Sequence, residues 1–263
     1  PVWVAILAAS LPMFMATLDN LVMTSALPVV QRDLGSSVSQ LSWFMNAYSL
    51  VFATFMLAAA TLGDRLGRRR VMLVGIGVFT VGSIAAALST TSEALIAARA
   101  VQGLGGAAIM PLSLTLLASA VPASRRAVAI GIWGGVSGLG VALGPVIGGA
   151  VVEGISWEAI FWLNVPVAVV AVPLLLRGVR ESRSSAPGRL DPVGTLALGG
   201  AVLAGIWGIV HGNDDGWSSA GVVGTLVLSV VLLATYLAWA SRRHDAVLPL
   251  RLFRSPSFSV ANV

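Results

Sequence analysis

The stretch Gly63–Val71, GDRLGRRRV, places four arginines and one aspartate between two long apolar segments. A basic cluster of this kind is typical of nucleic-acid binding, of a nuclear address or of a membrane surface. Leu41–Leu62 precedes the cluster and Val71–Leu88 follows it, and each is close to the length of about 20 apolar residues that crosses a bilayer. The flanks therefore predict a short loop between two membrane-spanning helices, too cramped to be a nucleic-acid arm.

The composition of the whole chain agrees with lipid as its solvent. Of the 263 residues, 57% are hydrophobic and only 10% are charged, whereas a soluble domain usually carries about 25% charged residues. The chain has no cysteine, which excludes disulfides, thiolate metal sites and a cysteine nucleophile. It also lacks the HExxH, GxSxG and GxxxxGK[ST] patterns. We therefore expect no enzyme activity, no metal site and no nucleic-acid partner.

Eight segments are apolar enough, and long enough, to be candidate spans of a bilayer. They predict an all-α polytopic membrane protein, and the first segment, which has no basic leader, is expected to be retained rather than cleaved. The expected spans are Val2–Leu27, Leu41–Leu62, Val71–Leu88, Ala94–Val121, Ala127–Val152, Ile160–Leu176, Val193–Val210 and Trp217–Ala240, with the start of a ninth at Ser257–Val263.

The placement of arginine predicts the orientation. Fourteen of the sixteen basic residues fall in alternate loops, while the opposite loops carry Arg32 and several acidic residues. Loops rich in arginine face the cytoplasm. We therefore expect a multi-pass protein of the cell (inner or plasma) membrane with its N-terminus in the cytoplasm.

Two ionisable side chains lie inside the expected spans, Asp19 in the first and Arg99 in the fourth. At about 1.5 Å per residue, Asp19 lies roughly 13 Å inward from Pro28 and Arg99 roughly 9 Å inward from Glu93. These depths allow a direct or water-mediated pair, and Gln102 shares the helix face of Arg99. Two interpretations stay open: a structural ion pair that locks two helices, or a polar site that contacts substrate.

Glycine recurs every fourth residue in the fifth expected span, at Gly140, Gly144 and Gly148, and Pro145 follows the second of these. Small residues at this spacing let two membrane helices approach closely, and proline bends a helix. Ordinary helix packing explains the spacing alone, but the proline within so dense a glycine run is less ordinary.

Aromatic side chains follow one face of the second expected span, at Phe44, Tyr48, Phe52 and Phe55. This face either lines a pocket for an aromatic or lipophilic substrate, or it faces lipid or a neighbouring helix. The candidates for lining a cavity are Tyr48, Phe52 and Trp133.

Taken together, these motifs resemble the major facilitator superfamily, specifically its fourteen-helix drug/proton antiporter branch. The sequences Leu18–Pro28 and Phe161–Pro166 resemble its first-helix and sixth-helix motifs, and Arg99–Gly106 resembles its fourth-helix motif. Leu21 and Thr24 stand where the first-helix motif usually has threonine and asparagine. The loop motif is carried by Gly63, Asp64, Arg65, Gly67 and Arg68, and the fifth-helix motif associated with antiport by Gly140, Gly144, Pro145, Gly148 and Gly149.

The resemblance implies a domain organisation. Residues 1–176 are expected to form a major-facilitator-type six-helix N-terminal bundle, residues 177–192 a cytoplasmic linker, and residues 193–240 an inserted pair of transmembrane helices. Residues 241–263 are expected to hold a cytoplasmic loop and the start of a ninth helix. The C-terminal half of such a transporter is then missing, and we expect the full-length protein to be a monomer.

The resemblance also implies a function, namely proton-coupled export of lipophilic, cationic or amphipathic small molecules by antiport, and hence antibiotic resistance. The proton gradient would drive export without a cofactor. Asp19 would take up the proton and attract cations, Arg99 would tune it, and Gly144 with Pro145 would shape an outer gate. The loop at Asp64 would be a conformational latch, or a topology anchor alone. Two other functions remain open: a dedicated exporter of one endogenous metabolite, and a non-transporting receptor or scaffold.

Overall fold

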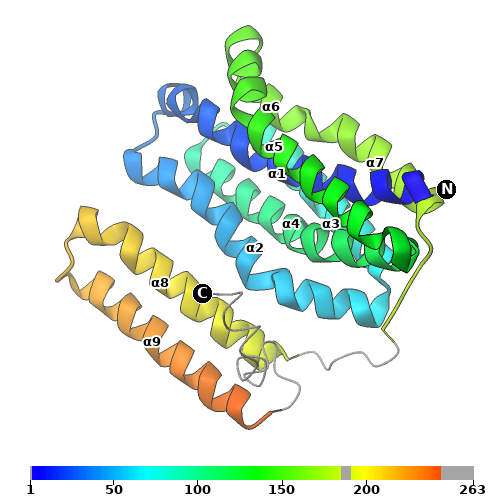
Figure 1. Cartoon of the computed structure of the whole chain (residues 1–263). Helices are drawn as coiled ribbons and strands as arrows, with labels where there is room; N and C mark the ends of the chain where they lie inside the picture. Colours follow the sequence, from blue (N-terminus) through cyan, green and yellow to red (C-terminus); the bar gives the residue numbers. More distant parts are fainter. Residues whose placement is uncertain (1, 185–190, 244–263) are drawn as a thin grey trace. The chain divides into compact units, whose positions relative to one another are not determined.

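The computed structural model describes residues 2–184 and 191–243, and every regular element in these ranges is helical (Figure 1). Contacts within the chain divide it into two units, Pro1–Ser185 and Ala186–Val263. The first unit contains α1 (Val2–Leu34), α2 (Val38–Leu66), α3 (Arg68–Ala87), α4 (Ser92–Ala120), a short 3-10 turn (Ala123–Arg125), α5 (Arg126–Gly154), α6 (Ala159–Trp162) and α7 (Asn164–Gly178); the second contains α8 (Pro192–Asp215) and α9 (Ala220–Ser241).

Within the described residues, eight helical segments are long and apolar enough to cross a membrane, which confirms the expected all-α polytopic architecture. The sixth span differs in detail from the expectation, because Leu163 interrupts it between α6 and α7. α7 also continues to Gly178, so it includes the first two residues of the stretch 177–192 that the sequence assigned to a linker. The expected start of a ninth helix, at 257–263, lies outside the described residues.

Polar side chains define where several helices begin. Ser37 and Gln40 form a reciprocal cap at the start of α2: the Ser37 Oγ accepts from the Gln40 backbone at 3.2 Å, and the Gln40 Oε1 accepts from the Ser37 backbone at 2.9 Å. Thr91 caps α4 through the backbone N–H of Ala94. These bonds satisfy N–H groups that the first turn of a helix leaves without partners.

Glycine allows the helices of the first unit to pack closely. α4 contacts α1, α2 and α3. A Cβ placed on Gly105 of α4 would collide with the backbone of Phe79 on α3, and one placed on Gly82 of α3 would lie 2.7 Å from the backbone nitrogen of Gln102. Close approach of this kind stabilises helix pairs in a membrane through van der Waals contact.

The glycine stripe of α5 lies against α1, and the two helices overlap in the view of Figure 1. A Cβ on Gly140 would lie 3.3 Å from the carbonyl oxygen of Phe14, and one on Gly148 would lie 2.9 Å from that of Val22. A Cβ on Gly144 would collide with the side chain of Leu21. The predicted close packing is therefore present at all three positions.

The second unit is an antiparallel pair of helices (Figure 1). The Ser229 hydroxyl on α9 donates to the carbonyl oxygen of Ala201 on α8 at 2.7 Å. Asp191 caps α8 through the Gly194 backbone and accepts a hydrogen bond from the Trp239 indole at 3.1 Å. These polar contacts tie the two helices together at two levels.

The α1–α5 packing predicts that alanine substitutions at two adjacent glycines have different effects on the free energy of unfolding. In the full-length protein, Gly148→Ala should lower the free energy of unfolding by about 1–3 kcal/mol, because its methyl group meets the α1 backbone. Gly149→Ala is the matched control: no atom lies within 4 Å of its Cβ position, so alanine should be neutral or stabilising by up to about 1 kcal/mol. Thermal unfolding in detergent measures both, and equal destabilisation of the two variants would contradict the packing.

Candidate functional site

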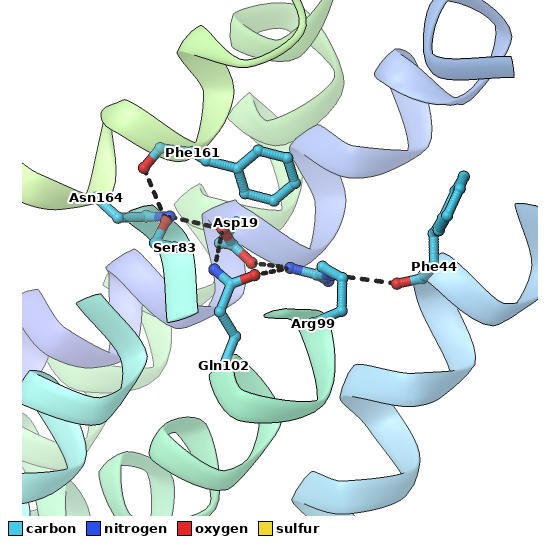
Figure 2. A network of polar contacts seen from close by, with 7 residues as sticks. All are labelled: Asp19, Phe44, Ser83, Arg99, Gln102, Phe161 and Asn164. Atoms are coloured by element: carbon cyan, nitrogen blue, oxygen red, sulfur yellow. Dashed lines mark hydrogen bonds and ion pairs between the residues drawn. The ribbon is translucent and has the colours of Figure 1, made fainter. Parts of the chain in front are cut away.

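A buried polar network lies inside the first unit and joins four of its helices (Figure 2). Asp19 is 4% exposed, and Arg99 and Gln102 are fully buried. The members of the network, which we call the Asp19 network, are Asp19 on α1, Ser83 on α3, Arg99 and Gln102 on α4, and Asn164 on α7.

Arg99 forms the positive end of the network. Its Nη1 donates to the Asp19 Oδ2 at 2.5 Å and to the Gln102 Oε1 at 2.9 Å, and its Nε donates to the Phe44 carbonyl oxygen at 3.1 Å. The guanidinium also lies 4.7 Å from the centre of the Tyr48 ring, which is within reach of a cation–π interaction. Its Nη2 is buried and has no hydrogen-bond partner among the described residues.

The second oxygen of Asp19 is also occupied. Its Oδ1 accepts from the Gln102 Nε2 at 3.0 Å and from the Asn164 Nδ2 at 2.6 Å. The Asn164 Nδ2 also donates to the Ser83 hydroxyl oxygen, and that hydroxyl donates in turn to the Phe161 carbonyl oxygen (Figure 2). Three donors therefore surround the carboxylate, and one of them is the positively charged guanidinium of Arg99, an arrangement that compensates a buried negative charge.

The structure thus pairs Asp19 directly with Arg99, as the estimated depths allowed, and Gln102 also donates to Asp19. Sequence reasoning did not select Asn164 or Ser83 as site residues. Asn164 stands in the Phe161–Pro166 motif, and an amide side chain in an otherwise apolar span was the available signal. The roles of these residues in proton uptake and substrate binding stay predictions.

A cavity of about 250 Å³ opens between α1, α2 and α4. We call it the Asn20 cavity; the residues that line it include Met13, Thr17, Asn20, Tyr48, Phe52 and Met110.

Two of the three predicted cavity residues line the Asn20 cavity, namely Tyr48 and Phe52, whose rings stack at 6.0 Å. Phe44 and Tyr48 are buried against neighbouring helices, so this part of the aromatic face does not face lipid. Trp133 does not line this cavity; its indole N–H donates instead to the Ser113 hydroxyl at 3.1 Å.

The glycines of the α2–α3 loop motif are both constrained. A Cβ on Gly63 would collide with the side chain of Leu112 on α4. Gly67 has a φ of +119°, a conformation that residues with a side chain rarely adopt. Asp64 accepts a hydrogen bond from the Arg68 Nε at 2.7 Å, and Arg65 is exposed. In this structure, the charges of Asp64 and Arg68 therefore pair within the loop.

The segment after α7 binds this loop, which the sequence did not indicate. Glu181 accepts hydrogen bonds from the backbone N–H groups of Arg69 and Arg70, at the first turn of α3. The Ser184 N–H donates to the Asp64 carbonyl oxygen at 3.0 Å. The Arg69 guanidinium donates to the Val179 carbonyl oxygen at 3.0 Å. The loop is thus anchored inside its own unit, and its role as a latch toward other helices stays a prediction.

The residues of the fifth-helix motif do not share one environment: some contact α1 and one does not. Gly140, Gly144 and Gly148 contact α1, and the Pro145 carbonyl oxygen accepts a hydrogen bond from the Ser25 hydroxyl at 3.2 Å. No atom lies within 4 Å of the Cβ position of Gly149, so this glycine does not serve the α1–α5 contact.

Among residues 2–184 and 191–243, no three acidic or histidine side chains gather to hold a metal ion.

Comparisons with known proteins place these features in a family context. Residues 9–253 match the sequence model of the Major Facilitator Superfamily. The chain is 37% identical to the tetracenomycin C resistance and export protein of Streptomyces glaucescens over 99% of its own length, and 36% identical to the multidrug efflux pump LfrA of Mycolicibacterium smegmatis over 98%. It covers 49% and 51% of these two relatives, so the chain spans about half their length.

The fold resembles that of solved transporters. The chain aligns with the crystal structure of a peptide transporter, POT, in complex with sulfate, with a TM-score of 0.66 at 17% sequence identity. The alignment covers 91% of this chain and 53% of that one. At this identity the likeness concerns the fold alone.

The Asp19 network predicts that Asn164 is important for stability. Asn164→Ala removes one donor to Asp19 and leaves the Ser83 hydroxyl with one partner fewer, so it should lower the free energy of unfolding of the full-length protein by about 1–3 kcal/mol. Asn46→Ala on α2 is the control, because no hydrogen bond of the Asn46 side chain is present among the described residues. Denaturation in detergent measures both variants, and an Asn164→Ala protein as stable as its control would contradict this account of the network.

Proposed function

The chain belongs to the Major Facilitator Superfamily, and on this premise we propose that the full-length protein is a proton-coupled exporter of lipophilic, amphipathic small molecules. Membership in this superfamily of transporters agrees with the expectation that the chain is not an enzyme. Its eight apolar helical spans make it a multi-pass membrane protein. The observation that carries the proposal is the buried ion pair between Asp19 and Arg99.

The relatives support export of small molecules. Two of them are named for resistance to, or export of, single antibiotics, and a third is named as a multidrug efflux pump. One of the first two is the methylenomycin A resistance protein of Streptomyces coelicolor, which is 36% identical to this chain with 55% of its length covered. Extending these activities to the full-length protein that contains this chain is part of the proposal.

A proton delivered to Asp19 would act on the whole network. It would remove the only negative charge that faces Arg99 among the members of the Asp19 network, and it would weaken the carboxyl group as an acceptor for its three donors. Loss of one partner from a buried ion pair costs about 3–5 kcal/mol, because the other charge stays buried without compensation. The contact between α1 and α4 would therefore reorganise, which couples protonation to conformation.

The same helices form the walls of the Asn20 cavity, so a shift of α1 against α4 would alter the cavity. Coupling of this kind is reciprocal: if proton binding changes the affinity for substrate, substrate binding changes the affinity for the proton by the same factor. In transporters built from repeats, such sites lie near the middle of the membrane between the two halves. Alternating access would then exchange protons and substrate across the cell membrane, with the arginine-rich loops and the N-terminus in the cytoplasm.

A dedicated exporter of one compound is a second candidate. It is favoured by the relative at 37% identity, whose name specifies tetracenomycin C. Competition among chemically unrelated compounds for export from vesicles separates the two candidates: mutual inhibition supports a broad exporter, and export of a single compound without inhibition by the others supports a dedicated one.

The proton-coupling proposal predicts a loss that is specific to Asp19. In vesicles containing the full-length protein, Asp19→Asn should abolish substrate accumulation driven by a proton gradient, because the asparagine side chain cannot take up and release a proton as a carboxylate does. Exchange of substrate down its own gradient should persist. Asp33→Asn is the control, since Asp33 lies on the same helix but is exposed.

Flux of a lipophilic dye, measured per molecule of protein in the membrane, distinguishes the outcomes. If Asp19→Asn accumulates the dye at the wild-type rate under a proton gradient, Asp19 is only a structural partner of Arg99. Equal loss in Asp33→Asn would mean that the effect is not specific to the buried carboxylate.

A further inference from the structure

We propose that the Asn20 cavity binds an uncharged, hydrogen-bonding aromatic part of the substrate, and that Asn20 is the residue that sets this preference. The inference rests on the proposed function and names the substrate chemistry of the half-site that this chain contributes. It departs from the cationic substrates expected from the sequence, because that expectation depended on the free charge of Asp19.

The aromatic wall of the cavity comes from α2. The Tyr48 and Phe52 rings stack at 6.0 Å with an angle of 18° between their planes. Gly106 on α4 gives these rings room, because a Cβ there would lie 2.7 Å from the Tyr48 hydroxyl and 3.3 Å from Phe52. Offset and edge-on contacts with such rings bind planar apolar groups. The wall therefore suits an aromatic ring system.

The polar group with free bonding capacity is the Asn20 side chain. Its Oδ1 is buried without a hydrogen-bond partner among the described residues. The neighbouring Thr17 hydroxyl, in contrast, donates to the Met13 carbonyl oxygen at 2.9 Å. A carboxamide offers both an acceptor and donors, and a half-turn of the group exchanges their places. A hydroxyl on the substrate can therefore donate to the Asn20 Oδ1, and a carbonyl or phosphoryl oxygen can accept from the Asn20 amide N–H groups.

The cavity offers no charge to a cation. None of the residues that line it is acidic or basic. Asp19 precedes Asn20 in the chain, but both its carboxylate oxygens are bonded within the Asp19 network and Arg99 balances its charge. A cation that leaves water for such a site loses its hydration without gaining a counter-ion. The lining therefore favours neutral polar groups over cations.

Two triphenyl probes of matched size separate charge from shape: neutral triphenylphosphine oxide, which accepts a hydrogen bond, and cationic methyltriphenylphosphonium, in which a methyl group replaces the oxygen. Binding is measured with purified full-length protein in detergent, without a gradient. Asn20→Leu should raise the Kd of the oxide about tenfold, the value of one good hydrogen bond, and leave that of the phosphonium unchanged. Asn20→Asp should lower the Kd of the phosphonium by at least about tenfold.

A second variant adds a charge from another wall of the cavity. Ser49 on α2 lines the cavity and is exposed, so Ser49→Asp should fold and should also tighten binding of the phosphonium. Asn46→Asp is the matched control: it places the same charge on the same helix at a residue that does not line the cavity. It should leave both dissociation constants unchanged.

Equal shifts for both probes in Asn20→Leu, or tightening of the phosphonium by Asn46→Asp as large as by Ser49→Asp, would overturn the assignment. So would an unchanged Kd of the oxide in Asn20→Leu. Since binding is measured without a proton gradient, these results leave proton-driven export to be decided by the vesicle experiments. Conversely, loss of proton coupling would not alter the expected selectivity of the cavity.

Discussion

The ion pair between Asp19 and Arg99 constrains the arrangement of the first unit. Both charges lie in membrane-spanning helices, where an uncompensated charge is costly, so α1 and α4 must place them in contact. Further hydrogen bonds to the pair come from Gln102 on α4, Asn164 on α7 and the Phe44 carbonyl oxygen on α2. One buried pair thus brings several helices to a common point.

α1 is held by two contacts of different physical kinds. Against α5 it packs through Gly140, Gly144 and Gly148, and the residues that make this close contact carry no ionisable side chain. Against α4 it is joined by Asp19 and Arg99, where a single proton removes the attraction. This asymmetry predicts that α1 and α5 move together while their contact with α4 opens and closes. Under the proposed mechanism, the network and the neighbouring cavity would change together.

Hydropathy was sufficient to predict the eight spans, because the bilayer imposes a length on every apolar helix, and the spacing of glycine predicted the α5 contact. Partners that are distant in sequence could not be predicted in this way. Asn164 bonds to Asp19 across 145 residues, and Glu181 caps α3 across 112 residues; no local pattern records either contact. Gly149 shows the converse limit, since it belongs to the motif but touches nothing within 4 Å of its Cβ position.

The central claim is that Asp19 is the group that gains a proton when the network opens. Infrared difference spectroscopy of the full-length protein in lipid, recorded as the pH is lowered, detects the carboxyl stretch of a newly protonated acid. The account predicts a band that is absent in Asp19→Asn and displaced in Gln102→Leu, because Gln102 donates to the Asp19 Oδ1. A band of unchanged position and intensity in Asp19→Asn would contradict the account and place the proton on another group.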